Sequence, residues 1–241
     1  MPASPLGSTL SAAEARDQQL FVAIVPNGTV PAAPPDPVTL TIAATAPTGS
    51  DTPQTITITS VTLPIGMRIG QELLFRDAAG SYKAVVTANV AAGATTTFTA
   101  LALEDIPVDA TAQFPTPLFL AQEYSTSDTT AINTFSSFDH GGTSDSSRGE
   151  SDQSVSFSVA ETFYNSGART LLYAKENELD VTLYNRQPNP DAGAFSTAPV
   201  EWLVGKVTDM SRAGANGDKQ IYSATIQVDG GFRRVDPTPI T

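Results

Sequence analysis

Two kinds of side-chain grouping could support chemistry, and the first is a possible oxyanion site. The single histidine, His140, is followed by Gly141 and Gly142, a run similar to the oxyanion-hole glycines of lipases. Such a run acts beside a G-x-S-x-G nucleophile turn, which the sequence does not contain. It also contains no Walker loop, dinucleotide fingerprint or histidine metal motif. We therefore interpret His140 as a turn residue and predict no catalytic residues and no enzymatic activity.

Acidic clusters are the second grouping, because carboxylate oxygens bind Ca²⁺. Glu104, Asp105 and Asp109 fall within six residues, but their spacing matches no EF-hand loop. A second acidic run consists of Asp139, Asp145, Glu150 and Asp152. Both runs are interpreted as solvated loops, so the sequence predicts neither a metal site nor a cofactor.

Composition excludes several further classes. The net charge is −12, which argues against a protein that binds nucleic acid through Lys and Arg clusters. Residues 1–152 carry 15 acids and 5 bases, whereas residues 153–241 carry 10 acids and 8 bases, so the acidity lies in the first part. Without cysteine there is no disulfide framework. Long apolar runs and a secretory signal pattern are also absent, so we expect no membrane partner.

The elements that carry the fold lie between Gln153 and Val228. Val155, Phe157 and Val159 alternate with serines, the period of a half-buried strand. Asn165 or Ser166 can cap a helix that we predict over residues 167–177, and residues 180–185 resume the strand period. A final strand pair is predicted around 200–228. The sequence therefore predicts a mainly-β fold, a β-sandwich with one flanking helix.

Proline-rich segments divide the rest of the chain. Residues 1–37 read as an arm, a first strand at 19–25 and a semi-rigid linker with prolines throughout 26–37. Residues 38–115 read as an inserted all-β domain of short Thr- and Val-rich strands, of sandwich or barrel type. The segment 117–124 is expected to pair with strand 20–25 once the insertion is set aside. Residues 116–232 then form the main domain, and 233–241 a tail.

The segment formed by residues 125–152 is long and polar and has no clear hydrophobic period. Such a segment in a compact domain is usually functional or disordered. In an oligomer it can also be a hairpin that becomes ordered only against a neighbouring subunit.

The order of these elements resembles the major tail tube proteins of long-tailed bacteriophages. The resemblance rests on QLFVAIV, LFLAQEY, SDQSVSFSVAE, ARTLLYAKE, ELDVTLYN and the terminal pair VEWLVGKVTDMSRAGANGDKQIYSATIQVDG. It covers residues 17–30 and 117–232, with the polar turn 212–218 as its most telling part. Residues 38–114 lie outside it and look similar to small β modules of phage structural proteins.

This resemblance implies a structural virion protein, assembled in the host cytoplasm, whose hexameric rings stack into a helical tube. The tube conducts genomic DNA from the capsid to the host during ejection, without sequence-specific binding. Implied protein partners are a tape measure, a terminator, a baseplate and, in a contractile tail, a sheath. The added β module is expected on the tube exterior, because the channel must stay open.

Two sets of site residues follow from the resemblance. A long loop, here Thr126–Asp152, and the terminal arms are expected to reach the adjacent ring. The candidate inter-ring residues are Thr126, Ile132, Phe135, Phe138, Asp139, Arg148 and Glu150. Acids facing the channel would repel DNA phosphates and keep DNA sliding, and strand position suggests Asp128, Asp180 and Asp209.

Two other hypotheses about the function stay open at this point. A cell-surface or carbohydrate-binding module would use residues 38–114 and stack sugar on Trp202 or Tyr82. A terminator or baseplate ring protein of the same tail would share the fold.

Overall fold

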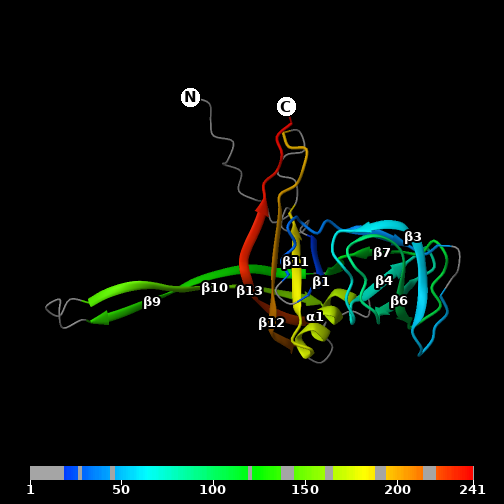
Figure 1. The fold of residues 1–241 in the computed structure, drawn as a ribbon, viewed down its shortest axis with the longest axis horizontal. Coiled ribbons are helices and arrows are strands. Elements are labelled where there is room, and N and C mark those ends of the chain that lie inside the picture. Colours follow the sequence, from blue (N-terminus) through cyan, green and yellow to red (C-terminus); the bar gives the residue numbers. More distant parts are fainter. Residues whose placement is uncertain are drawn as a thin grey trace.

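The computed structural model describes residues 19–26, 29–43, 47–118, 121–136, 144–160, 165–187, 194–213 and 221–240. Within these ranges the chain forms two antiparallel β-sheets and one α-helix (Figure 1). The predicted mainly-β fold with one flanking helix is confirmed.

The larger sheet has seven strands in the order β8-β1-β11-β12-β13-β10-β9. Its strands are β1 (Gln19–Ile24), β8 (Thr116–Leu118), β9 (Ala121–Ser136), β10 (Ser144–Ala160), β11 (Asp180–Arg186), β12 (Val200–Ala213) and β13 (Ile221–Val235). The predicted pairing of the first strand with the segment after the insertion is present, with Leu20 opposite Leu118 and Phe21 opposite Pro117. This pairing involves only the short strand β8, because the chain then leaves that edge of the sheet.

This sheet is strongly curled, as the connection between β8 and β9 requires. The two strands form opposite edges of the sheet, yet only two residues separate Leu118 from Ala121. Three Cα–Cα steps span about 11 Å at most, whereas seven strands in a flat sheet would hold their edges about 29 Å apart. The sheet must therefore bend until its edges approach each other at this corner.

Helix α1 (Ser166–Glu176) packs against the inside of this curl. The side chain of Asn165, one of the two predicted capping residues, accepts a hydrogen bond from the backbone N–H of Ala168 and caps the helix. Leu171 and Ala174 pack with Phe157 of β10 in one buried apolar cluster. The predicted helix, 167–177, differs from the observed one by a single residue at each end.

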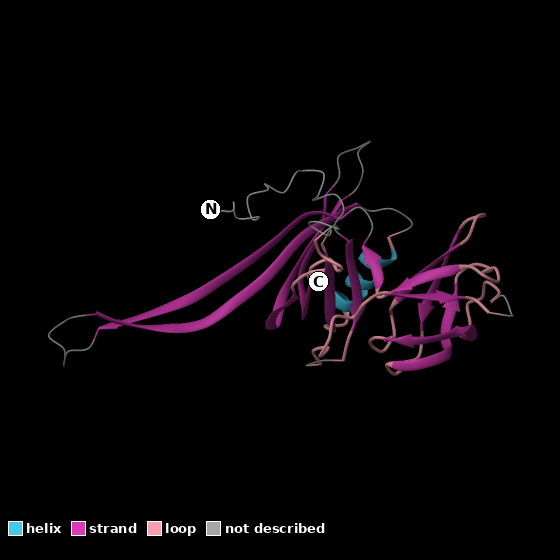
Figure 2. Ribbon diagram, turned by 90° about the horizontal axis from the view of Figure 1, so that it is seen from above, coloured by secondary structure: helices cyan, strands magenta, loops and turns pink. Residues whose placement is uncertain are grey.

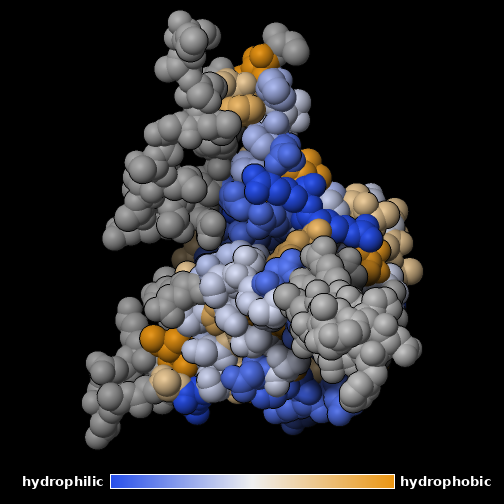
Figure 3. Space-filling model, turned by 90° about the vertical axis from the view of Figure 1, so that its left-hand side faces the viewer, coloured by the Kyte–Doolittle hydropathy of each residue, from blue (hydrophilic) through white to orange (hydrophobic). Residues whose placement is uncertain are grey.

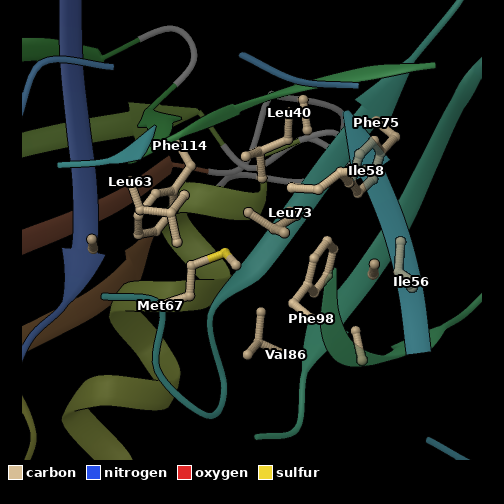
Figure 4. Close-up of a cluster of buried hydrophobic side chains, with 14 of the residues drawn as sticks. Leu40, Ile56, Ile58, Leu63, Met67, Leu73, Phe75, Val86, Phe98 and Phe114 are labelled. Carbon is tan, nitrogen blue, oxygen red and sulfur yellow. The ribbon is translucent and has the colours of Figure 1, made fainter. Parts of the chain in front are cut away.

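The smaller sheet has six strands, all from residues 38–114, in the order β2-β7-β4-β5-β6-β3. They are β2 (Val38–Thr41), β3 (Gln54–Leu63), β4 (Glu72–Arg76), β5 (Ser81–Val86), β6 (Gly93–Ala102) and β7 (Thr111–Phe114). A bridge between Ile42 and Ile58 brings the β2 and β3 ends together, so the sheet closes around its own core. Figure 4 shows this core, in which Leu73, Phe75 and Phe114 are fully buried. We call this part the six-stranded unit.

Residues 29–37, the predicted proline-rich linker, lie against the larger sheet on the face away from α1. The carbonyl of Pro31 accepts a hydrogen bond from the Trp202 indole N–H at 3.3 Å. The Tyr184 hydroxyl donates to the Asp36 carboxylate at 2.7 Å. Together with Phe21 and Val200, these two aromatic residues form a small separate core beneath the segment.

Candidate assembly surfaces

A long hairpin formed by β9 and β10 projects away from the rest of the molecule, on the side opposite the six-stranded unit (Figures 1 and 2). Its pairing runs from Val159 opposite Ala121 out to Ser144 opposite Ser136. Strand β13 pairs with β10 only along residues 154–160. In the part of the chain that the structure describes, no third strand pairs with β10 beyond Ser154, so about 30 Å of the hairpin stands as two strands alone.

This hairpin corrects the expectation of an irregular loop over Thr126–Asp152. The structure shows a hairpin whose two strands pair within one chain, whereas ordering against a neighbouring subunit stays a prediction. The segment has no apolar alternation, and over residues 144–153 β9 is the only described strand that pairs with β10. Its many threonines and serines are compatible with an extended strand, and Thr favours one. The period that normally reveals a strand is therefore missing from a segment that is nevertheless β.

Five of the seven candidate inter-ring residues lie on this hairpin. Thr126 is exposed on β9 opposite Val155, Ile132 is paired with Arg148, and Phe135 with Asp145. Glu150 lies on β10 where the register shifts between Arg148 and Ser151, a local bulge. Phe138 and Asp139 lie outside the described residues, as does His140.

The three candidate channel acids lie on three different strands and have different environments. Asp128 on β9 is exposed and accepts a hydrogen bond from the Gln153 side chain at 3.0 Å. Asp209 on β12 is exposed, and its carboxylate lies 4.0 Å from the Lys175 ammonium of α1. Asp180 is only 2% exposed, so in this chain it presents no carboxylate to a channel. That assignment fails because β11 is covered on both faces, which strand period cannot reveal.

A face rich in hydroxyl groups lies on the other side of β10 from the helix. Ser156 and Thr225 share a side chain–side chain hydrogen bond of 3.1 Å between neighbouring strands, and Ser125 donates to the carbonyl of Ser156. Because these side chains are small, they leave a trough of about 370 Å³ over β9, β10 and β13. Figure 3 views the molecule from the side toward which the hairpin points, where the coloured surface is largely hydrophilic.

The contacts of Tyr124 in β9 show how far the sheet curls. It packs against the helix-side core and lies close to Glu201 and Asn185, which belong to the central strands β12 and β11. Burial raises the pKa of the Tyr124 hydroxyl to about 12; the Glu201 carboxylate adds to the rise, and the neighbouring Asn185 amide opposes it. An edge strand thus meets the middle of its own sheet across the curl.

We expect the alkaline stability of the protein to depend on Tyr124. The pKa of its hydroxyl is higher in the folded chain (about 12) than the ordinary value of 10.0. Its stabilising contribution is therefore complete below pH 10 and is lost as the pH rises from 10 through 12, by about 2–3 kcal/mol. Tyr124→Phe should make the fall in unfolding free energy between these pH values correspondingly shallower in urea titrations. An unchanged slope would contradict the buried position of this hydroxyl.

Of the two alternative sugar-stacking residues, Trp202 is buried and Tyr82 is partly exposed. Trp202 is only 5% exposed, with its indole N–H bonded to Pro31. The hydroxyl of Tyr82 donates to Asp77 at 3.2 Å within a tight turn of the six-stranded unit. Among the described residues, no group of three or more His, Cys, Asp or Glu side chains is placed to hold a metal ion. Over the same residues, no helix is long and apolar enough to cross a membrane.

No model of a known protein family matches this chain, and no curated protein matches it. A function for this chain must therefore be inferred from the hairpin, the curled sheet and the residues on them.

Proposed function

We propose that the chain is a structural subunit of a bacteriophage tail tube, in which hexameric rings stack and conduct DNA from the capsid to the host. The observation that carries the proposal is the unsupported outer part of the β9–β10 hairpin. A two-stranded hairpin alone is marginally stable in water. Its free edges also invite pairing with another chain. A second copy of the chain is the partner that satisfies both requirements.

The geometry of the hairpin favours an open, repeating contact. The hairpin and the six-stranded unit lie on opposite sides of the larger sheet (Figure 1). A hairpin that binds a different surface of the next copy makes a heterologous contact, which generates a filament when it does not close on itself. Stacking of rings through the hairpin would therefore extend a tube and leave the six-stranded unit outside the channel.

The negative net charge supports a protein that conducts DNA rather than one that binds it. The net charge of −12 opposes adhesion of phosphates. Asp128 and Asp209 remain exposed and are the acids that we propose for the channel. Asp180 is buried and therefore does not belong to this set. The hydroxyl-rich face over β10 and β13 carries small neutral side chains, which suit a surface over which DNA has to move.

Negative-stain electron microscopy of the concentrated, purified protein tests this proposal. We expect rings or tubes with a central channel, together with a sedimentation profile that shifts to large species as concentration rises. Rings that never lengthen would instead favour a terminator or baseplate component of the same tail. A protein that stays strictly monomeric at high concentration would count against every member of this group.

A further inference from the structure

A buried polar cluster joins the six-stranded unit to helix α1 and the larger sheet. Its members come from segments far apart in the chain, and each is less than 10% exposed. They are Gln71, Glu72, Lys83, Thr116, Ser166 and Thr170. Polar groups in such surroundings are costly unless they are hydrogen-bonded, so their partners determine which parts of the chain must stay together.

Gln71, just before β4, connects the six-stranded unit to three other elements. Its side-chain oxygen accepts a hydrogen bond from the backbone N–H of Ile24 in β1 at 3.0 Å. Its amide nitrogen donates to the Thr116 hydroxyl of β8 at 2.7 Å and lies 3.4 Å from the Thr170 hydroxyl of α1. Separation of the two parts would leave this amide and its partners unsatisfied.

Glu72 supplies a charge that the helix lacks. The first turn of α1 contains no acidic residue, although the N-terminus of a helix attracts negative charge. The Glu72 carboxylate accepts a hydrogen bond from the Ser166 hydroxyl at the first residue of the helix, at 2.8 Å. The same carboxylate pairs with the buried Lys83 ammonium at 3.5 Å. A carboxylate of the six-stranded unit therefore stabilises the N-terminus of α1, the helix that packs on the larger sheet.

A close apolar contact lies beside this polar cluster. Gly70 has a positive φ of 85°, and a Cβ there would collide with the ring of Tyr173 in α1. The backbone of the six-stranded unit thus approaches the helix as closely as glycine permits.

We propose that the six-stranded unit is a built-in clamp on helix α1, so that the helix and both sheets unfold as one cooperative unit. This clamp would hold the six-stranded unit in one orientation to the larger sheet. The proposal is independent of the tail-tube function, because it concerns contacts within one chain. Removal of one member of a buried, hydrogen-bonded ion pair leaves the other unpaired, so loss of the clamp should weaken the helix at a distance.

The single tryptophan gives a clean test, because Trp202 lies in the larger sheet and its fluorescence reports on that sheet alone. Ile56 lies on β3 in the core of the six-stranded unit and is fully buried. If the clamp couples the two parts, Ile56→Ala should lower the Trp202 melting midpoint by roughly 5–15 °C. A Trp202 midpoint that stays within a degree of the unaltered protein, while β4 and β6 amides exchange faster, would overturn the proposal.

Variants at the joint test the polar cluster itself. Thr170→Val and Gln71→Met each remove hydrogen bonds across the joint while they keep side-chain volume. Both should lower the Trp202 midpoint by several degrees, and the double variant should lose less than the sum of the two, since they share partners. Thr39→Val, an exposed threonine on β2, is the matched control and should change the midpoint by about a degree or less. Effects of the two joint variants as small as that of the control would refute the clamp.

Hydrogen exchange of the unaltered protein keeps the proposal testable if a variant does not fold. Amides of α1 and of β4 should share the same, slowest opening reaction as denaturant is raised. An earlier and separate opening of the six-stranded unit would show that it is not a clamp.

Discussion

Replacement of residues 131–150 by Asn-Gly should give a chain that folds but forms no tubes. The flanking residues Thr130 and Ser151 lie opposite each other, so a two-residue turn can close the shortened hairpin there. Among the described strands, β13 pairs with β10 only along residues 154–160, so the removed β10 residues pair with β9 alone. The thermal midpoint should therefore move by no more than a few degrees, while the filament length in micrographs falls to that of single rings.

A mixing experiment provides the control for this truncation. Added to the full-length protein at low ratio, truncated subunits should cap growing tubes and shorten them in proportion to their share. Long tubes from the truncated chain alone would show that the hairpin does not connect successive rings. Loss of folding, detected by circular dichroism, would show that the hairpin supports its own chain.

Gly205→Ala should cost about 4 kcal/mol or more of unfolding free energy, a large part of the stability of an ordinary domain. Gly205 lies in β12 opposite Val228, and a Cβ there would collide with the carbonyl oxygen of Gln227 on the neighbouring strand. Both positions are backbone in the middle of a sheet, so neither can shift without breaking the strand ladder. Urea unfolding followed by Trp202 fluorescence measures the loss.

Gly80→Ala is the matched control for this change. A Cβ at Gly80 would meet only the Tyr82 side chain, at an ordinary 3.4 Å. We expect a change of less than about 1 kcal/mol there. Similar small effects at both glycines would contradict the close strand approach at Gly205.

Segments with a regular period could be predicted from the sequence. Alternating Val155, Phe157 and Val159 indicated a half-buried strand, and all three are buried in the helix-side core. The cap at Asn165 indicated where the helix begins, because its side chain satisfies a backbone N–H that the helix itself leaves unpaired.

Segments that depend on a distant partner could not be predicted. The outer hairpin lacks apolar alternation, so its strand character was visible only once β9 and β10 were paired. Asp180 has the position of a strand-end acid but is buried, because both faces of its strand are covered. A two-residue period tells which side chains share a face of a strand. It does not tell whether that face is covered by other elements or exposed to solvent.

The sequence by itself determined the β content, the single described helix with its ends, the acidity and the lack of a recognisable catalytic motif. Only the tertiary structure decided that the larger sheet curls, that the hairpin projects without support, and that Gln71, Glu72 and Thr170 meet in one buried cluster. The physical reason is separation along the chain. Periodicity and capping act between residues a few positions apart, whereas Gln71 and Thr170 are 99 residues apart and meet only through packing.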